Sequence, residues 1–352
     1  MSAAALARPE IAALTPYRTA VQRDETLRLN ANEVPRAPGA AAGLNRYPAI
    51  RPDALENRLA ELFAVDPARL LVTRGSSEAI DLLVRTFCRA YRDGIVTMPP
   101  TFAMYRVYAA MQSASVTEVP LDAERDFAPD VERVLAACDA HSKLVFICSP
   151  NNPTGGLVAR DDLERVLEER RGRSLVVVDE AYVEFSGEAS LLEALDRHDN
   201  LVVLRTLSKA WGLAGARCGA VAASAEIIGL LRRMLPPYAF STPASEAILA
   251  GLADAEAARE ACAALVAERE RLARALAAQD GVVRVWPSRA NFLLVRFVDL
   301  AAVTRRLEQD GVLIRAFADE PALAGCARIT IGTPDENARL LRALAGPEAV
   351  AS

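Results

Sequence analysis

The stretch TLSKAWGLAGAR, residues Thr206–Arg217, follows the apolar run Leu201–Leu204 and is rich in small and hydroxyl-bearing residues. The chain has 41 lysines and arginines together, and only Lys143 and Lys209 are lysines. Arginine supplies nearly all of the positive charge, and a guanidinium does not form an imine. A lysine in this turn therefore indicates an amine needed for its reactivity. The alternative is an ordinary surface lysine.

Length and composition predict a globular protein with a large core. The chain has 352 residues, of which 52% are hydrophobic and 25% charged, which is enough for more than one domain. No apolar run approaches the roughly 20 residues of a membrane-spanning helix, and residues 1–9 lack the apolar segment of a secretory signal. We expect a cytoplasmic protein with no membrane partner. The net charge of -5, without a basic block, argues against nucleic acid as a partner.

Cysteine and histidine are placed in ways that argue against several kinds of site. The six cysteines form no CxxC pair and are predicted to be reduced and buried: Cys88, Cys138, Cys148, Cys218, Cys262 and Cys326. The two histidines, His141 and His198, have no ligand-spaced companions, so neither a zinc site nor a Ser/His/Asp triad is predicted. The sequence also lacks the glycine-rich dinucleotide and P-loop motifs.

From Asp53 onward, apolar strand-like runs alternate with amphipathic helical stretches, which predicts an α/β fold with a mainly parallel sheet. Residues 244–279 have helical periodicity and predict one long helix or two, joining two domains. We expect three parts. Residues 1–45 are an irregular arm, broken by prolines, that joins the small domain. Residues 46–275 form a large domain, and residues 276–352 form a smaller α+β domain.

Three predicted strand ends carry polar groups. Ser76 and Ser77 follow a glycine turn at the start of a helix, where free N–H groups favour an anion, although helix capping also explains them. Asn152 lies in the turn at residues 149–156, and ligands collect at the carboxyl ends of strands in α/β sheets. Asp179 ends a fully apolar strand, so it needs a cationic partner unless it caps a helix.

These groups and Lys209 predict a common ligand. It has an electrophilic aldehyde for the amine, an anionic group for the serine turn, and a protonatable ring nitrogen for Asp179. Thr206, Ser208 and Arg217 supply further donors for an anion. Pyridoxal 5'-phosphate has all three features.

The sequence resembles the fold-type I pyridoxal-phosphate enzymes of the aspartate aminotransferase superfamily, and within it the histidinol-phosphate aminotransferases. The segments that carry the resemblance are Leu14–Tyr17, Leu29–Glu33, Arg46–Pro48, Pro99–Phe102, Ser149–Gly155, Asp179–Tyr182, Thr206–Arg217, Gly311–Arg315 and Arg328–Gly332. The resemblance implies a large domain with a mainly parallel sheet flanked by helices, and a smaller α+β domain. The implied reaction exchanges an amino group between L-histidinol phosphate and 2-oxoglutarate, giving imidazole-acetol phosphate and L-glutamate, in histidine biosynthesis.

The resemblance also implies roles for individual residues. Lys209 is the catalytic lysine, which holds the cofactor as a Schiff base and later carries a proton. Asp179 keeps the ring nitrogen protonated, while Asn152 and Tyr182 bind the ring oxygen and Phe102 stacks on the ring. The groups implied to bind the cofactor phosphate are Ser76, Ser77, Thr206, Ser208 and Arg217, with Tyr47 reaching the cofactor of a partner subunit. A homodimer with shared active sites follows from that role of Tyr47.

Substrate choice falls, by the same resemblance, to Tyr17, Arg315 and Arg328. Two arginines and a tyrosine can hold a substrate phosphate, and Arg328 can also hold the carboxylate of glutamate. An exposed strand-end cation is the alternative for Arg315. The sequence departs from the family pattern at residues 34–37, after Asn32 and Glu33, and at Ser77, where the family usually has aspartate.

Three other functions are consistent with parts of this pattern. An aromatic amino acid aminotransferase uses the same scaffold, and a threonine-phosphate decarboxylase also needs a substrate-phosphate site. A regulator with an aminotransferase-like sensor domain is the alternative outside catalysis, but it requires an additional DNA-binding domain, and this acidic chain starts almost directly at the substrate-side arm.

Overall fold

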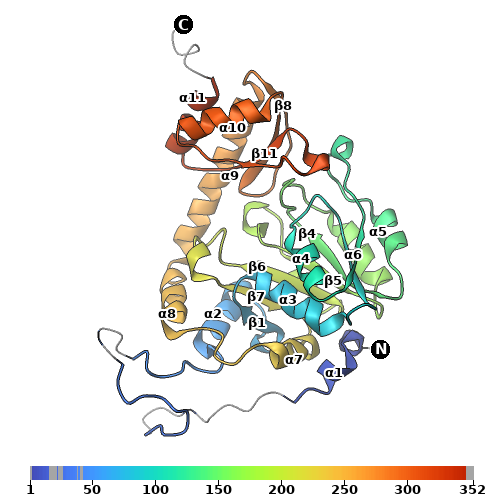
Figure 1. The fold of residues 1–352 in the computed structure, drawn as a ribbon, viewed down its shortest axis with the longest axis vertical. Coiled ribbons are helices and arrows are strands. Elements are labelled where there is room, and N and C mark those ends of the chain that lie inside the picture. The colour runs from blue at the N-terminus through green and yellow to red at the C-terminus, as the bar shows by residue number, and fades with distance from the viewer. Residues whose placement is uncertain (1, 16–21, 23–26, 38, 40–42, 346–352) are drawn as a thin grey trace.

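The computed structural model describes residues 2–15, 22, 27–37, 39 and 43–345 (Figure 1). Its larger part is built on a seven-stranded sheet with the order β1-β7-β6-β5-β4-β2-β3. Only β7 runs antiparallel to its neighbours, so the sheet is mainly parallel, as predicted. The strands are β1 Leu70–Thr73, β2 Gly94–Thr97, β3 Ser115–Glu118, β4 Ser142–Cys148, β5 Leu175–Asp179, β6 Leu201–Thr206 and β7 Gly219–Ala222.

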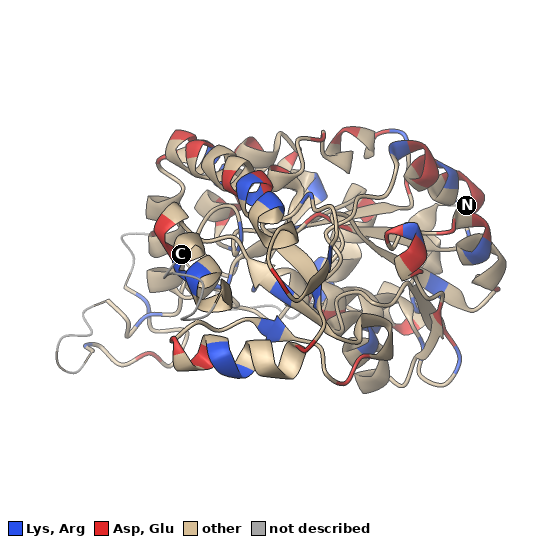
Figure 2. Cartoon of the chain, turned by 90° about the horizontal axis from the view of Figure 1, so that it is seen from above, with Lys and Arg blue, Asp and Glu red and all other residues tan. Residues whose placement is uncertain are grey.

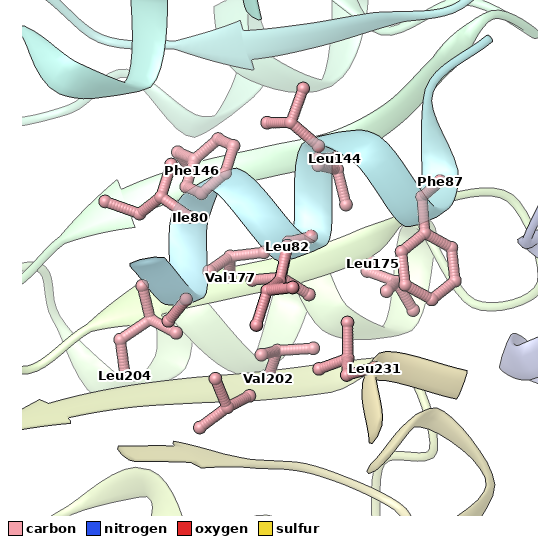
Figure 3. Packing of buried hydrophobic residues seen from close by; sticks show 14 of the residues in the cluster. Ile80, Leu82, Phe87, Leu144, Phe146, Leu175, Val177, Val202, Leu204 and Leu231 are labelled. Atoms are coloured by element: carbon pink, nitrogen blue, oxygen red, sulfur yellow. The ribbon is translucent and has the colours of Figure 1, made fainter. Parts of the chain in front are cut away.

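Helices cover both faces of this sheet, because its central strands are apolar on both sides. On β5, Leu175 and Val177 face one layer of helices, while Val176 and Val178 face the other. Figure 3 shows the first layer, where Ile80 and Leu82 pack over the sheet. Burying each such side chain contributes about 1.5–3 kcal/mol. The helices of this part are α2 Asp53–Phe63, α3 Ser76–Phe87, α4 Met104–Met111, α5 Val131–Ala137, α6 Arg160–Glu169, α7 Ala225–Met234 and α8 Thr242–Gly251.

A second, smaller sheet lies at the other end of the long helix α9 (Ala255–Ala277), as Figure 1 shows. It is antiparallel, with the order β10-β11-β9-β8, and has its own core, to which the last turns of α9 contribute Leu272 and Leu276. Its elements are β8 Val282–Val285, β9 Phe292–Phe297, α10 Leu300–Gln309, β10 Arg315–Ala316, β11 Cys326–Thr330 and α11 Pro334–Ala345. Of the alternatives for residues 244–279, the structure has two helices.

The N-terminal residues differ from the prediction that prolines break every element there. A 3-10 helix η1 (Ala3–Leu6) and a short helix α1 (Pro9–Ala12) are formed, and Pro9 begins α1 because its fixed φ suits the first helical position. Both elements pack against α7, on the side of the large sheet. Further 3-10 helices are η2 Pro67–Arg69, η3 Ala123–Arg125, η4 Val183–Phe185, η5 Leu191–Ala194, η6 Ala214–Ala216 and η7 Pro321–Leu323.

Three other expectations are corrected in detail. The sequence pattern predicts a helix over residues 76–91, but the helix ends at Phe87, four residues earlier. The apolar run at residues 312–316 predicts a strand, but a strand forms only at Arg315–Ala316. All six cysteines are free, but Cys138 is only partly buried, because it lies at the end of α5.

Acidic and basic residues alternate along the helices in Figure 2, in keeping with the modest net charge of -5. In the part of the chain that the structure describes, no helix combines the length and the apolar character needed to cross a membrane.

Candidate active site

The strands β4, β5 and β6 end around a cavity of about 240 Å³. Eleven of the residues predicted from the sequence line it, together with two that were not predicted, Cys148 and Ala181. The predicted ones are Ser76, Ser77, Phe102, Asn152, Asp179, Tyr182, Thr206, Ser208, Lys209, Arg217 and Arg328. Groups from distant parts of the sequence thus meet at one edge of the sheet, as the topology of an α/β fold requires.

One end of the cavity is suited to an anion. Helix α3 begins there at Ser76, and the preceding Gly75 contributes no side-chain cap, so the first N–H groups of the helix remain free for a ligand. Gly75 has a φ of +78°, and a Cβ added to it would lie 2.8 Å from Nη2 of Arg217. Any other residue would therefore be strained and would displace that guanidinium. The Ser208 hydroxyl lies beside the Arg217 guanidinium and accepts a hydrogen bond from its Nη1 at 3.4 Å.

Asp179 forms the acidic end of the cavity and is only 2% exposed. Its Oδ2 accepts a hydrogen bond from the Tyr105 hydroxyl at 2.8 Å, and its Oδ1 accepts one from the Ala181 N–H at 3.1 Å. Burial raises the pKa of Asp179 to about 6, and these two hydrogen bonds and the charge of Lys209 offset only part of the effect. A cation bound beside this carboxyl would therefore be stabilised.

Lys209 lines the same cavity. Its side chain is partly open to solvent, and its Nζ lies 5.6 Å from the centre of the Tyr182 ring. Partial burial lowers the pKa of Lys209, and the charges of Arg328 and Arg217 lower it further. A larger fraction of neutral amine, the form that attacks an aldehyde, follows from this environment.

Arg328 comes from β11 and reaches the cavity from the smaller sheet. Its Nη1 donates a hydrogen bond to Oδ1 of Asn152, and its guanidinium carbon lies 5.4 Å from the centre of the Phe292 ring. Arg315 is paired with Arg328 in the sheet, but its side chain lines a neighbouring cavity of about 500 Å³. The two cavities share Phe102, Asn152 and Arg328.

Of the predicted residues that the structure describes, Tyr47 does not line the cavity. Tyr47 is 51% exposed and stacks on Tyr238, with ring centres 4.7 Å apart. Tyr17 lies outside the described residues. A larger cavity of about 730 Å³ lies behind the loop that carries Lys209, but no lysine lines it and most of its surface is apolar, so we place the chemistry in the smaller cavity.

Sequence reasoning missed Tyr105, although the signal was available. The sequence predicts a helix that opens at Pro99–Phe102 and runs to about Gln112, and Tyr105 lies three residues beyond Phe102, a spacing that places it toward the same site.

The raised pKa of Asp179 gives a prediction about the cofactor-free protein. Between pH 3.8 and about 6 the folded chain keeps a proton that the unfolded chain releases, so this group lowers the free energy of unfolding as the pH rises. Over this pH range the contribution of Asp179 to the free energy of unfolding falls by roughly 3 kcal/mol, at about 1.4 kcal/mol for each pH unit. Unfolding in urea is measured for the wild type and for Asp179→Asn. We expect the difference between their free energies of unfolding to fall from pH 3.8 to about 6 and to stay level at higher pH. A difference that is constant with pH would contradict the assignment.

With the geometry established, comparison with known proteins defines the class. Residues 17–344 match the family of class I and II aminotransferases, and the chain belongs to that family. Within it, the chain is 47% identical to a histidinol-phosphate aminotransferase of Stenotrophomonas maltophilia (strain R551-3), over 99% of this chain and 98% of that protein. Within the family, this chain therefore belongs with the histidinol-phosphate aminotransferases.

Solved structures agree with this fold. The crystal structure of histidinol-phosphate aminotransferase from Sinorhizobium meliloti, in complex with pyridoxal-5'-phosphate, has a TM-score of 0.75 and 27% identity, covering 86% of this chain and 83% of that one. The L-threonine-O-3-phosphate decarboxylase of Porphyromonas gingivalis has a TM-score of 0.73 and 26% identity, covering 86% and 90%. The same scaffold therefore supports a different reaction, and the substrate has to be argued from the site.

Proposed function

We propose that this chain is a pyridoxal-phosphate-dependent aminotransferase that interconverts L-histidinol phosphate and 2-oxoglutarate with imidazole-acetol phosphate and L-glutamate, in histidine biosynthesis. The observation that carries the proposal is one cavity that combines an amine of lowered pKa, a buried acid, a free helix N-terminus and an arginine from the smaller sheet. The identity to histidinol-phosphate aminotransferases over nearly the full chain supports the choice of substrate.

The residues of the cavity offer a partner to each charged group of the cofactor. The free N–H groups of α3 at Ser76 and Ser77, together with Arg217, suit its phosphate. The Asp179 carboxylate is buried and its hydrogen bonds offset only part of the cost of burial, so it suits the cationic ring nitrogen of the cofactor. When bound, pyridoxal phosphate supplies an electrophilic aldehyde and a ring that accepts an electron pair.

The chain's own residues then have separate tasks. Lys209 holds the cofactor covalently and moves a proton to and from the α-carbon of the substrate, for which an amine that is neutral part of the time is needed. Asp179 holds a proton on the ring nitrogen by its negative charge. Asn152 and Tyr182 orient the ring through its oxygen, and Phe102 covers one face.

Thr206 and Ser208 complete the phosphate site. The Thr206 hydroxyl accepts a hydrogen bond from the Ser208 N–H at 3.2 Å, which fixes the start of the loop that leads to Lys209. Both hydroxyls line the cavity on the side of Arg217. The loop thus places a reactive amine and anion donors next to each other.

The substrate is held by groups of the smaller sheet. Arg328 reaches the cavity and can bind a carboxylate or a phosphate with two parallel hydrogen bonds. Arg315 lies in the adjoining cavity, where it can bind the far end of a longer substrate. We include Tyr17 in this substrate site. The phosphate of L-histidinol phosphate extends further from the amino-bearing carbon than an α-carboxylate does, so it can contact both arginines, whereas the carboxylate of an aromatic amino acid leaves Arg315 without a partner.

This difference gives a test of the substrate. The cofactor-loaded enzyme is mixed, in the absence of 2-oxoglutarate, with L-histidinol phosphate, L-phenylalanine or L-threonine phosphate, and loss of the cofactor's visible absorbance band is followed. We expect saturation at the lowest concentration with histidinol phosphate. Arg315→Ala should raise that half-saturation concentration about tenfold to a hundredfold, the value of a charge-assisted hydrogen bond, and leave that for phenylalanine nearly unchanged.

Arg305→Ala is a matched control, because Arg305 is an exposed cation on α10 away from both cavities. A preference for phenylalanine would move the protein to the aromatic aminotransferases. Release of carbon dioxide from threonine phosphate would move it to the decarboxylases. If Arg315→Ala raises the half-saturation concentrations of histidinol phosphate and phenylalanine equally, Arg315 does not recognise the substrate phosphate.

We further propose a cytoplasmic homodimer with shared active sites, in which residues 1–45 form an arm, residues 46–275 the large domain and residues 276–352 the small domain. Support comes from residues 27–37 of the arm, which extend away from the body of the chain in Figure 1 and expose Leu27 and Leu29 at 83% and 84%. Glu33 holds this arm to Arg28 and Arg46 and accepts a hydrogen bond from the Tyr47 N–H at 2.8 Å. Tyr47 is thereby presented outward, where a second copy can contact it.

A further inference from the structure

Tyr105 lies directly behind Asp179 and is completely buried. Its hydroxyl donates to Oδ2 of Asp179 at 2.8 Å. Its ring stacks on Phe146 of β4, with centres 4.7 Å apart and planes inclined by 14°, and meets the Phe102 ring edge-on at 5.7 Å. The hydroxyl is therefore aimed at the carboxylate by a ring that cannot turn away without disturbing the core.

The two hydrogen bonds fix the direction of the Asp179 carboxylate. Tyr105 occupies one oxygen and the Ala181 N–H occupies the other, so the plane of the group is set from two different elements. Asp179 also lines the cofactor cavity, and its remaining acceptor capacity is free to meet a ligand there. A hydroxyl that donates to a carboxylate favours the ionised form, which burial opposes.

From this geometry we propose that Tyr105 is a positioning residue for catalysis, which keeps Asp179 ionised and aimed at the ring nitrogen of the bound cofactor. The Tyr105 ring also packs against Phe102. One buried tyrosine therefore positions both Asp179, at the edge of the cofactor ring, and Phe102, on its face. This inference rests on the proposed function, because it needs Asp179 to be the partner of the ring nitrogen.

Tyr105→Phe tests the inference, since it removes the hydroxyl and keeps the ring that packs on Phe146. A hydrogen bond to a charged group corresponds to about tenfold to a hundredfold in an equilibrium or a rate. We expect the dissociation constant of pyridoxal phosphate, measured by titration of the cofactor-free protein, to rise by about this factor. We also expect kcat to fall by a similar factor while KM for the amino donor changes little.

A second readout needs neither cofactor nor turnover. In the cofactor-free protein, loss of the hydroxyl should raise the pKa of Asp179 further, so the free energy of unfolding should keep falling to a higher pH than in the wild type. The charged and titratable groups that face Asp179 are Tyr105 of α4, Cys148 of β4, Tyr182 beside η4 and Lys209 after β6. The last three are unchanged in this variant.

Tyr108→Phe is the matched control, because Tyr108 is on the same helix and packs against the same core, but the acidic groups nearest to it are Asp81 and Glu78. Asp179→Asn is measured in parallel. If Asp179→Asn is impaired and Tyr105→Phe matches Tyr108→Phe in all three readouts, the inference is wrong and the proposed function stands. If Asp179→Asn binds the cofactor and turns over like the wild type, the role proposed for Asp179 is itself wrong.

Discussion

Lys209→Ala is expected to abolish amino-group transfer, with kcat reduced by at least about 10⁴-fold. The substitution removes both the covalent attachment of the cofactor and the group that moves the proton at the substrate carbon, and proton transfer by a positioned side chain alone contributes about 10²–10⁴-fold. Lys209→Arg should be equally inactive, because the guanidinium keeps the charge but stays protonated. The measurement is steady-state formation of glutamate from histidinol phosphate and 2-oxoglutarate.

Lys143 provides the control, since it is the only other lysine of the chain. It lies at the start of β4, where its amine donates a hydrogen bond to the Ala140 carbonyl at 3.2 Å, and it does not line the cavity. Lys143→Ala should keep wild-type turnover. Retained turnover in Lys209→Ala would remove the basis of the proposed function.

Asp179→Asn is the second large effect that we expect. The variant keeps the size of the side chain but loses the charge that stabilises a protonated ring nitrogen. Removing one preorganised electrostatic group from an enclosed site costs about 10²–10³-fold in kcat. The cofactor should still attach to Lys209, so its visible absorbance should persist while the rate falls.

Asp179→Glu separates charge from position, because it keeps the carboxylate and moves it by one methylene. Partial recovery of kcat relative to Asp179→Asn is expected for a role that depends on charge. If Asp179→Asn and wild type have the same kcat, the carboxylate is only a structural group at the end of β5, as its alternative role as a helix cap suggested.

The fold was largely predictable because apolar runs of four to seven residues alternate with amphipathic helices. The strand Leu175–Asp179 is apolar up to its last residue, and a strand buried on both faces has this pattern. The ends of elements were less predictable. Pro9 begins a helix although proline usually breaks one, and only the packing of Ala3 and Ile11 on the large sheet's side shows why the N-terminal helices form.

The lining of the candidate site was predictable for a related reason. In a parallel sheet the strand ends meet at one edge, so Asn152, Asp179 and Lys209 had to lie near one another once their strands were identified. Contacts that depend on side-chain direction were not predictable. The hydrogen bond from Tyr105 to Asp179 depends on how α4 is placed relative to β5. The hydrogen bond from Arg328 to Asn152 depends on how the two sheets are placed relative to each other.

The most direct test of the central claim uses the small number of lysines. The cofactor-loaded protein is reduced with borohydride, which fixes pyridoxal phosphate to the amine that holds it, and is then digested and examined by mass spectrometry. We predict the label on Lys209 alone, with Lys143 and the N-terminal amine unmodified. A label on Lys143 or on the N-terminus, or no label on a protein with bound cofactor, would contradict the account.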